Sequence, residues 1–155
     1  MPHSCRLRKG RVSSAGQYYA ITICCKSKAA VFNNLSVNQV VIREIYQLEQ
    51  ENCIKLIAYT LMPDHLHLLF QLMDMCSLSN VIRSLKGRTA TKLRAMNIRK
   101  LWQKDFYDTC ILHDTMLRNQ ARYIVANPLR ARLVKQIGDY PYWNCIYLSK
   151  GIEDL

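Results

Sequence analysis

Runs of apolar and β-branched residues mark the strands that this sequence predicts. Three runs occupy 18–25, 54–61 and 65–72, and the aromatic-rich segment 101–108 is expected to include a further short strand. Only residues 62–64 separate the second run from the third. A connection this short predicts that these two strands are antiparallel neighbours.

Apolar residues at helical spacing predict three helices. The first is expected over 36–52, with Ser36 as its N-cap in a capping-box pattern. The second begins after Ser77 or Ser79, and the third is expected over 115–126. The order β-α-β-β-α-β-α predicts an α+β, ferredoxin-like sandwich. We expect an antiparallel sheet of four to five strands with helices on one face.

The length of 155 residues is typical of a single domain, and we expect one domain over 1–155. Residues 1–16 are expected to form a basic N-terminal arm, and 138–155 an extended C-terminal tail. No run approaches the ~20 apolar residues of a membrane helix, so no membrane partner is expected. The seven cysteines include no C-x-x-C pair, which predicts reduced thiols in a cytoplasmic protein.

The formal charge of +11, from 22 Lys and Arg against 11 Asp and Glu, favours a polyanionic partner such as nucleic acid. The cations gather in the arm and in 83–104, a segment without acidic residues. Small residues between cations of the second helix would let a phosphate backbone approach, although a solvated basic face has the same pattern. The candidate nucleic-acid-binding residues are Arg6, Arg8, Lys9, Arg11, Arg83, Lys86, Arg88 and Arg94.

Two histidines, His65 and His67, stand at the start of the third predicted strand. Side chains alternate along a strand, so both imidazoles are expected on one face. Leu66, Leu68 and Phe70 would then point to the opposite face and into a core. Two imidazoles on one face can share a metal ion, but ordinary strand histidines have the same spacing, which does not decide between the two interpretations.

Tyr123 lies off the apolar stripe of the third predicted helix, and Asn127 follows four residues later on the same face. A tyrosine and an amide that point away from the core could meet a metal-bound phosphate. A tyrosine packed on a neighbour and an asparagine that ends a helix before Pro128 fit the helix geometry equally well.

Several motifs in fixed order resemble those of known DNA transposases. Residues 62–67 read MPDHLH and resemble the His-hydrophobic-His (HUH) motif of single-tyrosine transposases. Residues 102–108 read WQKDFYD and resemble the W-Q-x-x-F-x-D segment of the bacterial REP-associated tyrosine transposases. Residues 122–131 read RYIVANPLRA and resemble their R-Y-I-x-x-N-P-x-R-A signature, and 138–143 resemble their closing segment. The resemblance extends from about residue 8 to 148.

This resemblance implies a nuclease and strand transferase, a transposase, that acts on single-stranded DNA beside hairpins such as those of REP-like repeats. It implies Tyr123 as the nucleophile of a 5′-phosphotyrosine intermediate. It also implies that His65, His67 and Asn127 hold one Mg²⁺ or Mn²⁺ ion, while the arm and the second helix contact hairpin phosphates. The protein is then expected on the nucleoid in the cytoplasm, and the sequence does not decide between monomer and homodimer.

Two positions depart from residues that are common in that family. Arg132 stands where glycine is common, and arginine would strain the turn if the backbone has a positive φ there. Thr109 stands where histidine is frequent. An alternative of a different class is a hairpin-DNA-binding or RNA-binding protein of the same fold that has lost catalysis. A metal hydrolase for small substrates is disfavoured by the excess of Lys and Arg.

Overall fold

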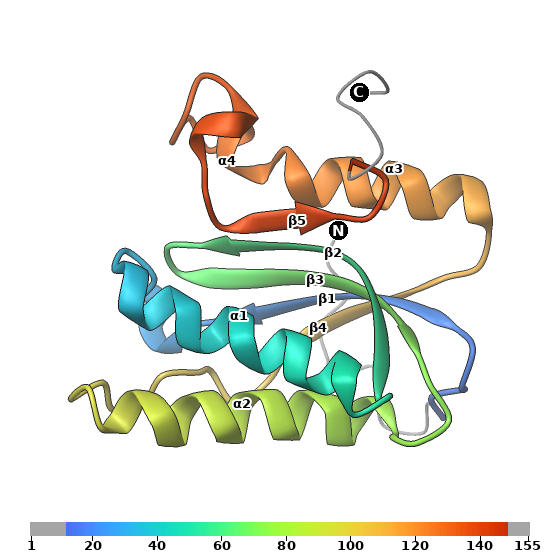
Figure 1. The fold of residues 1–155 in the computed structure, drawn as a ribbon, viewed down its shortest axis with the longest axis horizontal. Helices are drawn as coiled ribbons and strands as arrows, with labels where there is room; N and C mark the ends of the chain where they lie inside the picture. The colour runs from blue at the N-terminus through green and yellow to red at the C-terminus, as the bar shows by residue number, and fades with distance from the viewer. Residues whose placement is uncertain (1–11, 149–155) are drawn as a thin grey trace.

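A computed structural model of the protein describes residues 12–148 and shows a central five-stranded sheet in the order β4-β1-β3-β2-β5 (Figure 1). The predicted DNA-contacting residues of the arm lie outside the described residues: Arg6, Arg8, Lys9 and Arg11. Neighbouring strands are all antiparallel. The strands are β1 (Tyr18–Cys24), β2 (Ile54–Met62), β3 (His65–Leu72), β4 (Tyr107–Ile111) and β5 (Trp143–Cys145).

The helices are α1 (Leu35–Gln50), α2 (Leu78–Arg94), α3 (Asp114–Val125) and the short α4 (Asn127–Arg130), with 3-10 turns η2 (Lys26–Lys28) and η3 (Ile137–Asp139). The α+β class and the antiparallel sheet are confirmed, and the order of the first four strands is that of the ferredoxin-like arrangement. Strand β4 begins at Tyr107, close to the end of the segment 101–108 in which a short strand was predicted. No helix in the described part of the chain is long and apolar enough to cross a membrane.

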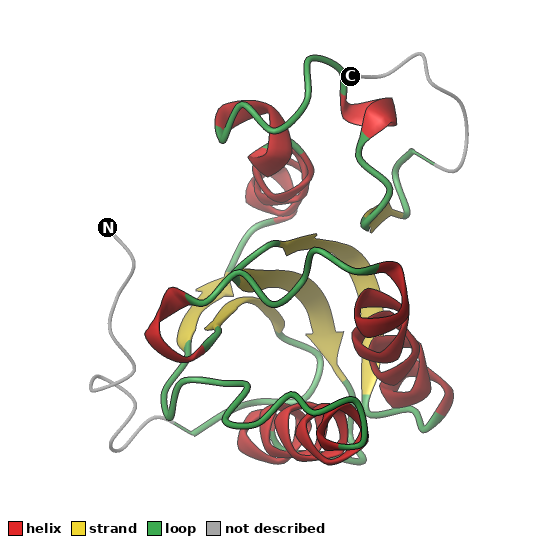
Figure 2. Ribbon diagram, turned by 90° about the vertical axis from the view of Figure 1, so that its left-hand side faces the viewer, coloured by secondary structure: helices red, strands yellow, loops and turns green. Residues whose placement is uncertain are grey.

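The helices do not share one face of the sheet as expected, because α3 packs opposite α1 and α2 (Figures 1 and 2). The apolar stripe of α3, which includes Leu117 and Ile124, packs on Ala20, Ala58 and Leu69 of the sheet. These residues alternate along their strands with residues that face α1 and α2. The central strands are therefore buried on both faces, and the molecule has two apolar cores.

Strand β3 contributes alternate side chains to the two cores. Leu66, Leu68 and Phe70 are fully buried in the core beneath α1 and α2, as predicted. Leu69 is buried in the other core, which is covered by α3. Strand alternation places His67 on the same face as Leu69, so this histidine lies on the α3 side of the sheet.

Two of the predicted helix N-caps can be compared with the structure. The N-cap of α1 is Asn34 rather than Ser36, because the Asn34 side chain accepts hydrogen bonds from the N–H groups of Ser36 and Val37 at 2.9 and 3.4 Å. The predicted cap at Ser77 is confirmed, since its hydroxyl accepts from the Asn80 N–H at 3.2 Å. Both caps satisfy amide groups that a helix start leaves without intrahelical partners.

The prediction that all cysteines are reduced was wrong for one pair. Cys53 and Cys76 form a disulfide with their Cα atoms 5.2 Å apart and a sequence separation of 23 residues. The fold brings them together because the chain leaving β3 runs beside the start of β2, where the Met73 N–H donates to the Cys53 carbonyl at 3.0 Å. Cys24, Cys25 and Cys145 are free thiols.

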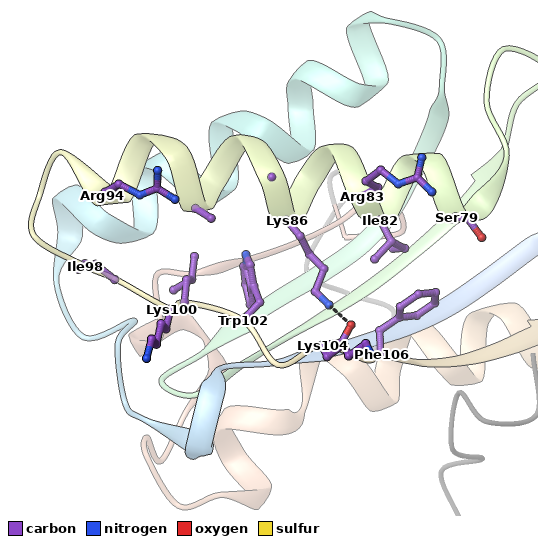
Figure 3. Close-up of a pocket in the computed structure, with 13 residues that line it drawn as sticks. Ser79, Ile82, Arg83, Lys86, Arg94, Ile98, Lys100, Trp102, Lys104 and Phe106 are labelled. Carbon is purple, nitrogen blue, oxygen red and sulfur yellow. Dashed lines mark hydrogen bonds between the residues drawn. The ribbon is translucent and has the colours of Figure 1, made fainter.

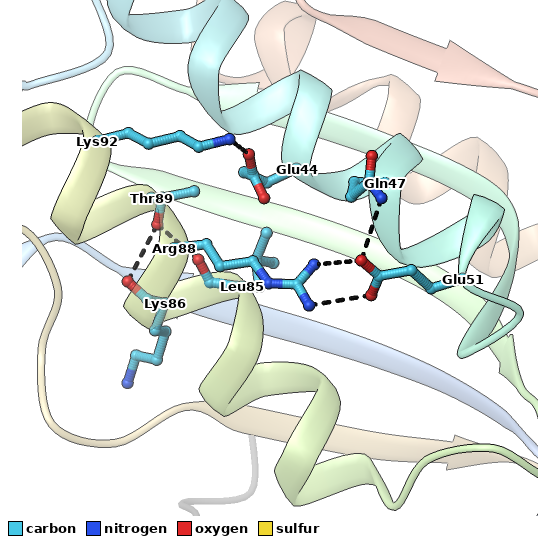
Figure 4. A network of polar contacts seen from close by, with 8 residues as sticks. All are labelled: Glu44, Gln47, Glu51, Leu85, Lys86, Arg88, Thr89 and Lys92. Atoms are coloured by element: carbon cyan, nitrogen blue, oxygen red, sulfur yellow. Dashed lines mark hydrogen bonds and ion pairs between the residues drawn. The ribbon is translucent and has the colours of Figure 1, made fainter.

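Charged side chains join α1 to α2 (Figure 4). Arg88 donates two hydrogen bonds to the Glu51 carboxylate, at 2.9 and 3.0 Å, and this contact lowers the pKa of Glu51. Lys92 pairs with Glu44, whose side chain is almost fully buried between the helices. These pairs direct cations of α2 toward α1, which could not be inferred from the position of each residue on the helix.

Helix α4 ends in a left-handed residue at Arg132, whose φ is 56°. The Arg132 N–H donates to the Leu129 carbonyl and the Leu133 N–H donates to the Pro128 carbonyl, both at 3.0 Å. This is the hydrogen-bond pattern of a Schellman helix end, in which glycine is usual at the left-handed position. The strain anticipated for arginine at this position is therefore present, and a left-handed non-glycine residue costs roughly 1–2 kcal/mol.

Replacing Arg132 by glycine is expected to raise the free energy of unfolding by about 0.5–1 kcal/mol, because relief of strain exceeds the entropic cost of glycine. Urea denaturation of the variant and the parent protein measures the change. Ala131→Gly is the matched control, since Ala131 has a helical φ of −78° and glycine should there lower stability by roughly 0.5–1 kcal/mol. Equal losses in both variants would show that Arg132 is not strained.

Candidate active site

A row of side chains crosses the sheet beneath the C-terminal end of α3. In the strand register Tyr107 pairs with Thr22, Thr22 with His67, and His67 with Thr60. Paired residues point to the same face of a sheet. The Thr60 hydroxyl donates to the Ile124 carbonyl at 2.9 Å, and both groups are buried. This bond fixes the last turn of α3 over the row that contains His67.

The imidazoles of His65 and His67 converge at their Nε2 atoms, which lie 3.0 Å apart. Nδ1 of His65 lies 2.5 Å from Oδ1 of Asp64, and Nδ1 of His67 lies 3.0 Å from the hydroxyl of Thr22. A neutral imidazole that donates from Nδ1 carries its lone pair on Nε2. If each ring donates from Nδ1, to Asp64 or to Thr22, the two Nε2 lone pairs face one another across 3.0 Å, where one cation would bind both.

The surroundings of His67 keep its ring neutral. Burial, with smaller contributions from the charges of His65 and Arg130, lowers the pKa of His67 to about 3, against an opposing effect of Asp64. A neutral imidazole is the form that binds a metal ion. At neutral pH, His67 can thus accept a metal without first losing a proton.

The geometry of the two histidines fits a shared metal ion. Ligands at ~2.1 Å from an ion and at right angles around it are about 3.0 Å apart, which is the separation of the two Nε2 atoms. Among the described residues, no three His, Cys, Asp or Glu side chains gather at one point. A metal here would therefore need oxygen donors of another type besides the imidazoles.

Asn127 offers such a donor at the end of α3. Its Nδ2 donates to the Ile124 carbonyl at 3.1 Å, the same carbonyl that binds Thr60, and lies 3.4 Å from the Tyr123 carbonyl. Because Thr60 is the register partner of His67, the amide of Asn127 is held close to the histidine row. Its Oδ1 is the atom that a metal would use.

Tyr123 and His67 line one cavity of about 530 Å³ between α3 and the sheet. The Tyr123 side chain is 55 % exposed and lies off the buried stripe of α3, as predicted from the helix pattern. The structure therefore brings the predicted nucleophile and one predicted ligand together within a single chain. His65 is not among the residues that line this cavity and reaches it only through its contact with His67.

Other residues of this region were not identified from the sequence. Asp64 is part of the quoted histidine motif, but its role as the partner of His65 depends on side-chain geometry. Thr22 could have been found only from the register of β1 against β3. Gln120 lines the cavity one helical turn before the tyrosine. Thr109, which stands where histidine is frequent, also lines the cavity and therefore faces the predicted site.

The predicted DNA-contacting residues of α2 divide into two sets. Arg83, Lys86 and Arg94 line a groove of about 650 Å³ between α2 and the segment 98–106, whereas Arg88 is turned toward Glu51 (Figures 3 and 4). The groove has a basic rim and an apolar floor. Its other lining residues include Lys100 and Lys104 among the cations and Ile82, Ile98, Trp102 and Phe106 among the apolar side chains.

The Lys86 side chain crosses this groove and is hydrogen-bonded to the segment 98–106 on the opposite side. Its ammonium group donates to the carbonyls of Gln103 and Lys104 at 2.7 and 3.0 Å. Gln103 in turn lines the cavity that contains Tyr123, whereas Lys104 lines the groove. The segment 98–106 is thus a wall shared by the groove and the cavity, and Lys86 holds it in place.

Comparison with known proteins places this fold and these motifs in a family. The family described as "Transposase IS200 like" matches residues 13–127. A REP-associated tyrosine transposase of Escherichia coli is 24% identical over 99 residues, which cover 63% of this chain and 58% of that protein. A Haemophilus influenzae protein provisionally named a REP-associated tyrosine transposase is 27% identical over 140 residues, covering 82% of this chain and 78% of that protein.

A solved structure supports the same assignment at the level of the fold. The structure of a REP-associated tyrosine transposase bound to a REP hairpin superimposes with a TM-score of 0.73 and 21% sequence identity, covering 86% of this chain and 79% of that one. These findings confirm the resemblance to REP-associated tyrosine transposases. Because the matched family region spans most of the chain and contains both histidines and Tyr123, the protein belongs to the IS200-like transposase family.

Proposed function

We propose that this protein is a metal-dependent nuclease and strand transferase that acts on single-stranded DNA beside DNA hairpins. The observation that carries the proposal is one cavity lined by both Tyr123 and His67, whose imidazole contacts that of His65. The REP-hairpin complex of the structural neighbour supports a hairpin as the DNA partner. The protein would then work at the nucleoid.

The chemistry follows from the types of side chain in the cavity. A phenol is a weak nucleophile at neutral pH, because it is largely protonated. A bound Mg²⁺ or Mn²⁺, held by His65, His67 and Asn127, would neutralise charge on the scissile phosphate. The Tyr123 oxygen forms a bond to phosphorus as the bond to the 3′ oxygen breaks. The phenol gives up its proton and the departing 3′ oxygen takes one up, so the products are a 5′-phosphotyrosine link and a free 3′-OH.

This exchange conserves the phosphodiester bond, so a 3′-OH can reverse it on the same or another DNA end without ATP. The position of Tyr123 on an exposed helix face gives DNA access to the phenol. Thr60 keeps that helix end against the sheet through its hydrogen bond to the Ile124 carbonyl. The nucleophile is therefore presented by a fixed helix end.

A covalent DNA–protein adduct is the test of this proposal. Hairpins with single-stranded flanks, taken from DNA beside the gene for this protein, would be incubated with the protein and Mg²⁺ or Mn²⁺. We expect an adduct that survives denaturation and a DNA fragment with a free 3′-OH. Hairpin binding without an adduct under any of these conditions would instead favour the alternative, a binding protein of the same fold that has lost catalysis.

The groove beside α2 is proposed to hold phosphates of the hairpin. Arg83 and Arg94 are exposed cations on its rim, and small residues between them, Gly87 and Ala90, leave room for a phosphate backbone. Lys86 is assigned to the wall of the groove, and Arg88 to the contact with α1. The basic N-terminal arm is proposed to contact the hairpin as well.

Neutralising the rim is expected to weaken hairpin binding and its dependence on salt. Removing the cation that binds one phosphate should reduce the slope of log K against log[salt] by about 0.9. Fluorescence anisotropy of a labelled hairpin at several salt concentrations would compare Arg83→Gln and Arg94→Gln with Arg43→Gln. Arg43 is an exposed residue of α1 and serves as the control for net charge. Equal slopes for all three variants would exclude the groove as the hairpin site.

A further inference from the structure

We propose that Arg130 is a positioning residue that holds the ring of Tyr123 at the reaction centre, a role that rests on the proposed function. The guanidinium carbon of Arg130 lies 3.7 Å from the centroid of the Tyr123 ring. Its Nη2 also donates to the Tyr123 carbonyl at 2.7 Å. One side chain thus contacts both the backbone and the ring of the proposed nucleophile.

The break between α3 and α4 brings the two residues together. Pro128 lies at the start of α4, and the chain turns there, so that Arg130 comes back over the last turn of α3. The Tyr123 carbonyl belongs to that last turn, in which carbonyl groups have no N–H partner within the helix. The guanidinium group of Arg130 donates a hydrogen bond to this carbonyl, and its planar face remains available for stacking on the ring.

Stacking of Arg130 on the ring restrains Tyr123, whose side chain is not held by packing. The Tyr123 side chain is 55 % exposed, so few neighbours restrict its rotation. A guanidinium within about 6 Å of a ring centroid is attracted to the ring face, and Arg stacks with its planar group parallel to aromatic rings more readily than Lys. Arg130 therefore limits the orientations of the phenol, which matters because misplacing a reacting atom by about 1 Å can lower a rate roughly 100-fold.

The charge of Arg130 also reaches the histidine site. It is one of the positive charges that lower the pKa of His67. A guanidinium has five N–H donors, and donors beyond the one used on the Tyr123 carbonyl could contact a phosphate that approaches the phenol. Ring orientation and phosphate attraction would then favour the same reaction.

The kinetic test compares adduct formation with DNA binding in variants of Arg130. Arg130→Gln is expected to form the adduct about 10- to 100-fold more slowly, with the hairpin Kd changed by a much smaller factor. Arg130→Lys keeps the charge but lacks the planar group, so it should recover only part of the rate. Arg118→Gln is the matched control, because Arg118 lies over the ring of Tyr147, 5.2 Å from its centroid. Adduct formation by Arg130→Gln at the wild-type rate would overturn the proposal.

A second measurement does not depend on activity. In protein labelled with fluorotyrosine, the ¹⁹F resonance of Tyr123 is identified by its absence from Tyr123→Phe. It is expected to shift in Arg130→Gln and to stay in place in Arg118→Gln. An unmoved resonance in Arg130→Gln would overturn the contact whether or not the wild type reacts. A shifted resonance in a protein that forms no adduct would uphold the contact and reject the proposed function.

Discussion

Tyr123→Phe is expected to bind hairpin DNA as tightly as the wild type and to form no covalent adduct with it. The substitution removes one oxygen atom from a side chain that is largely exposed, so the fold and the groove should be unaffected. Loss of a nucleophile usually lowers turnover by several orders of magnitude, and we expect a fall of at least roughly 1,000-fold here. Denaturing gel electrophoresis of labelled hairpins measures the adduct, and anisotropy measures binding.

Tyr147→Phe is the control for this substitution. Tyr147 is a partly buried tyrosine that, like Tyr123, is stacked with an arginine, but it packs against the core beneath α3 and does not line the cavity. It should form the adduct at the wild-type rate. An adduct that persists in Tyr123→Phe would assign the nucleophile to another residue. In that case Tyr107, which also lines the cavity, would be the first to replace.

The direction of each side chain on β3 could be predicted because strand alternation is a local property. Leu66 and Leu68 had to be buried, so His65 and His67 had to lie on the other face. The position of Tyr123 off the stripe of α3 could be predicted for the same reason. In each case the spacing of apolar residues along one element was sufficient.

Contacts between distant elements could not be predicted in this way. The stripe of α3 indicates that the helix is buried, but it does not indicate which face of the sheet the helix covers. Arg88 shares its helix with the rim cations of the groove, yet its partner Glu51 lies 37 residues away, at the C-terminal end of α1. The stack of Arg130 on Tyr123 requires the turn at Pro128, which brings two helices into contact. Such pairings depend on how elements pack together.

The metal site leads to the second large expected effect. Mn²⁺ should stabilise the wild-type protein by about 2.7 kcal/mol at a 100-fold excess over its Kd, because it binds the folded state. His67→Ala should lose this stabilisation and the adduct together, since His67 provides one of the two converging Nε2 atoms. Thermal unfolding with increasing Mn²⁺, and the metal dependence of adduct formation, measure the two effects separately.

Asp64→Asn is expected to weaken Mn²⁺ binding without abolishing it. Asp64 contacts Nδ1 of His65 and would not itself bind the ion, so the variant should need about 10- to 100-fold more Mn²⁺ for the same stabilisation. His113→Ala is the control for nonspecific binding, because His113 is an exposed residue at the start of α3 that makes no capping hydrogen bond. If Mn²⁺ stabilised His67→Ala, Asp64→Asn and His113→Ala equally, the ion would bind elsewhere. The converging imidazoles would then be a pair joined by a hydrogen bond, and any strand transfer by Tyr123 would have to proceed without a metal at that site.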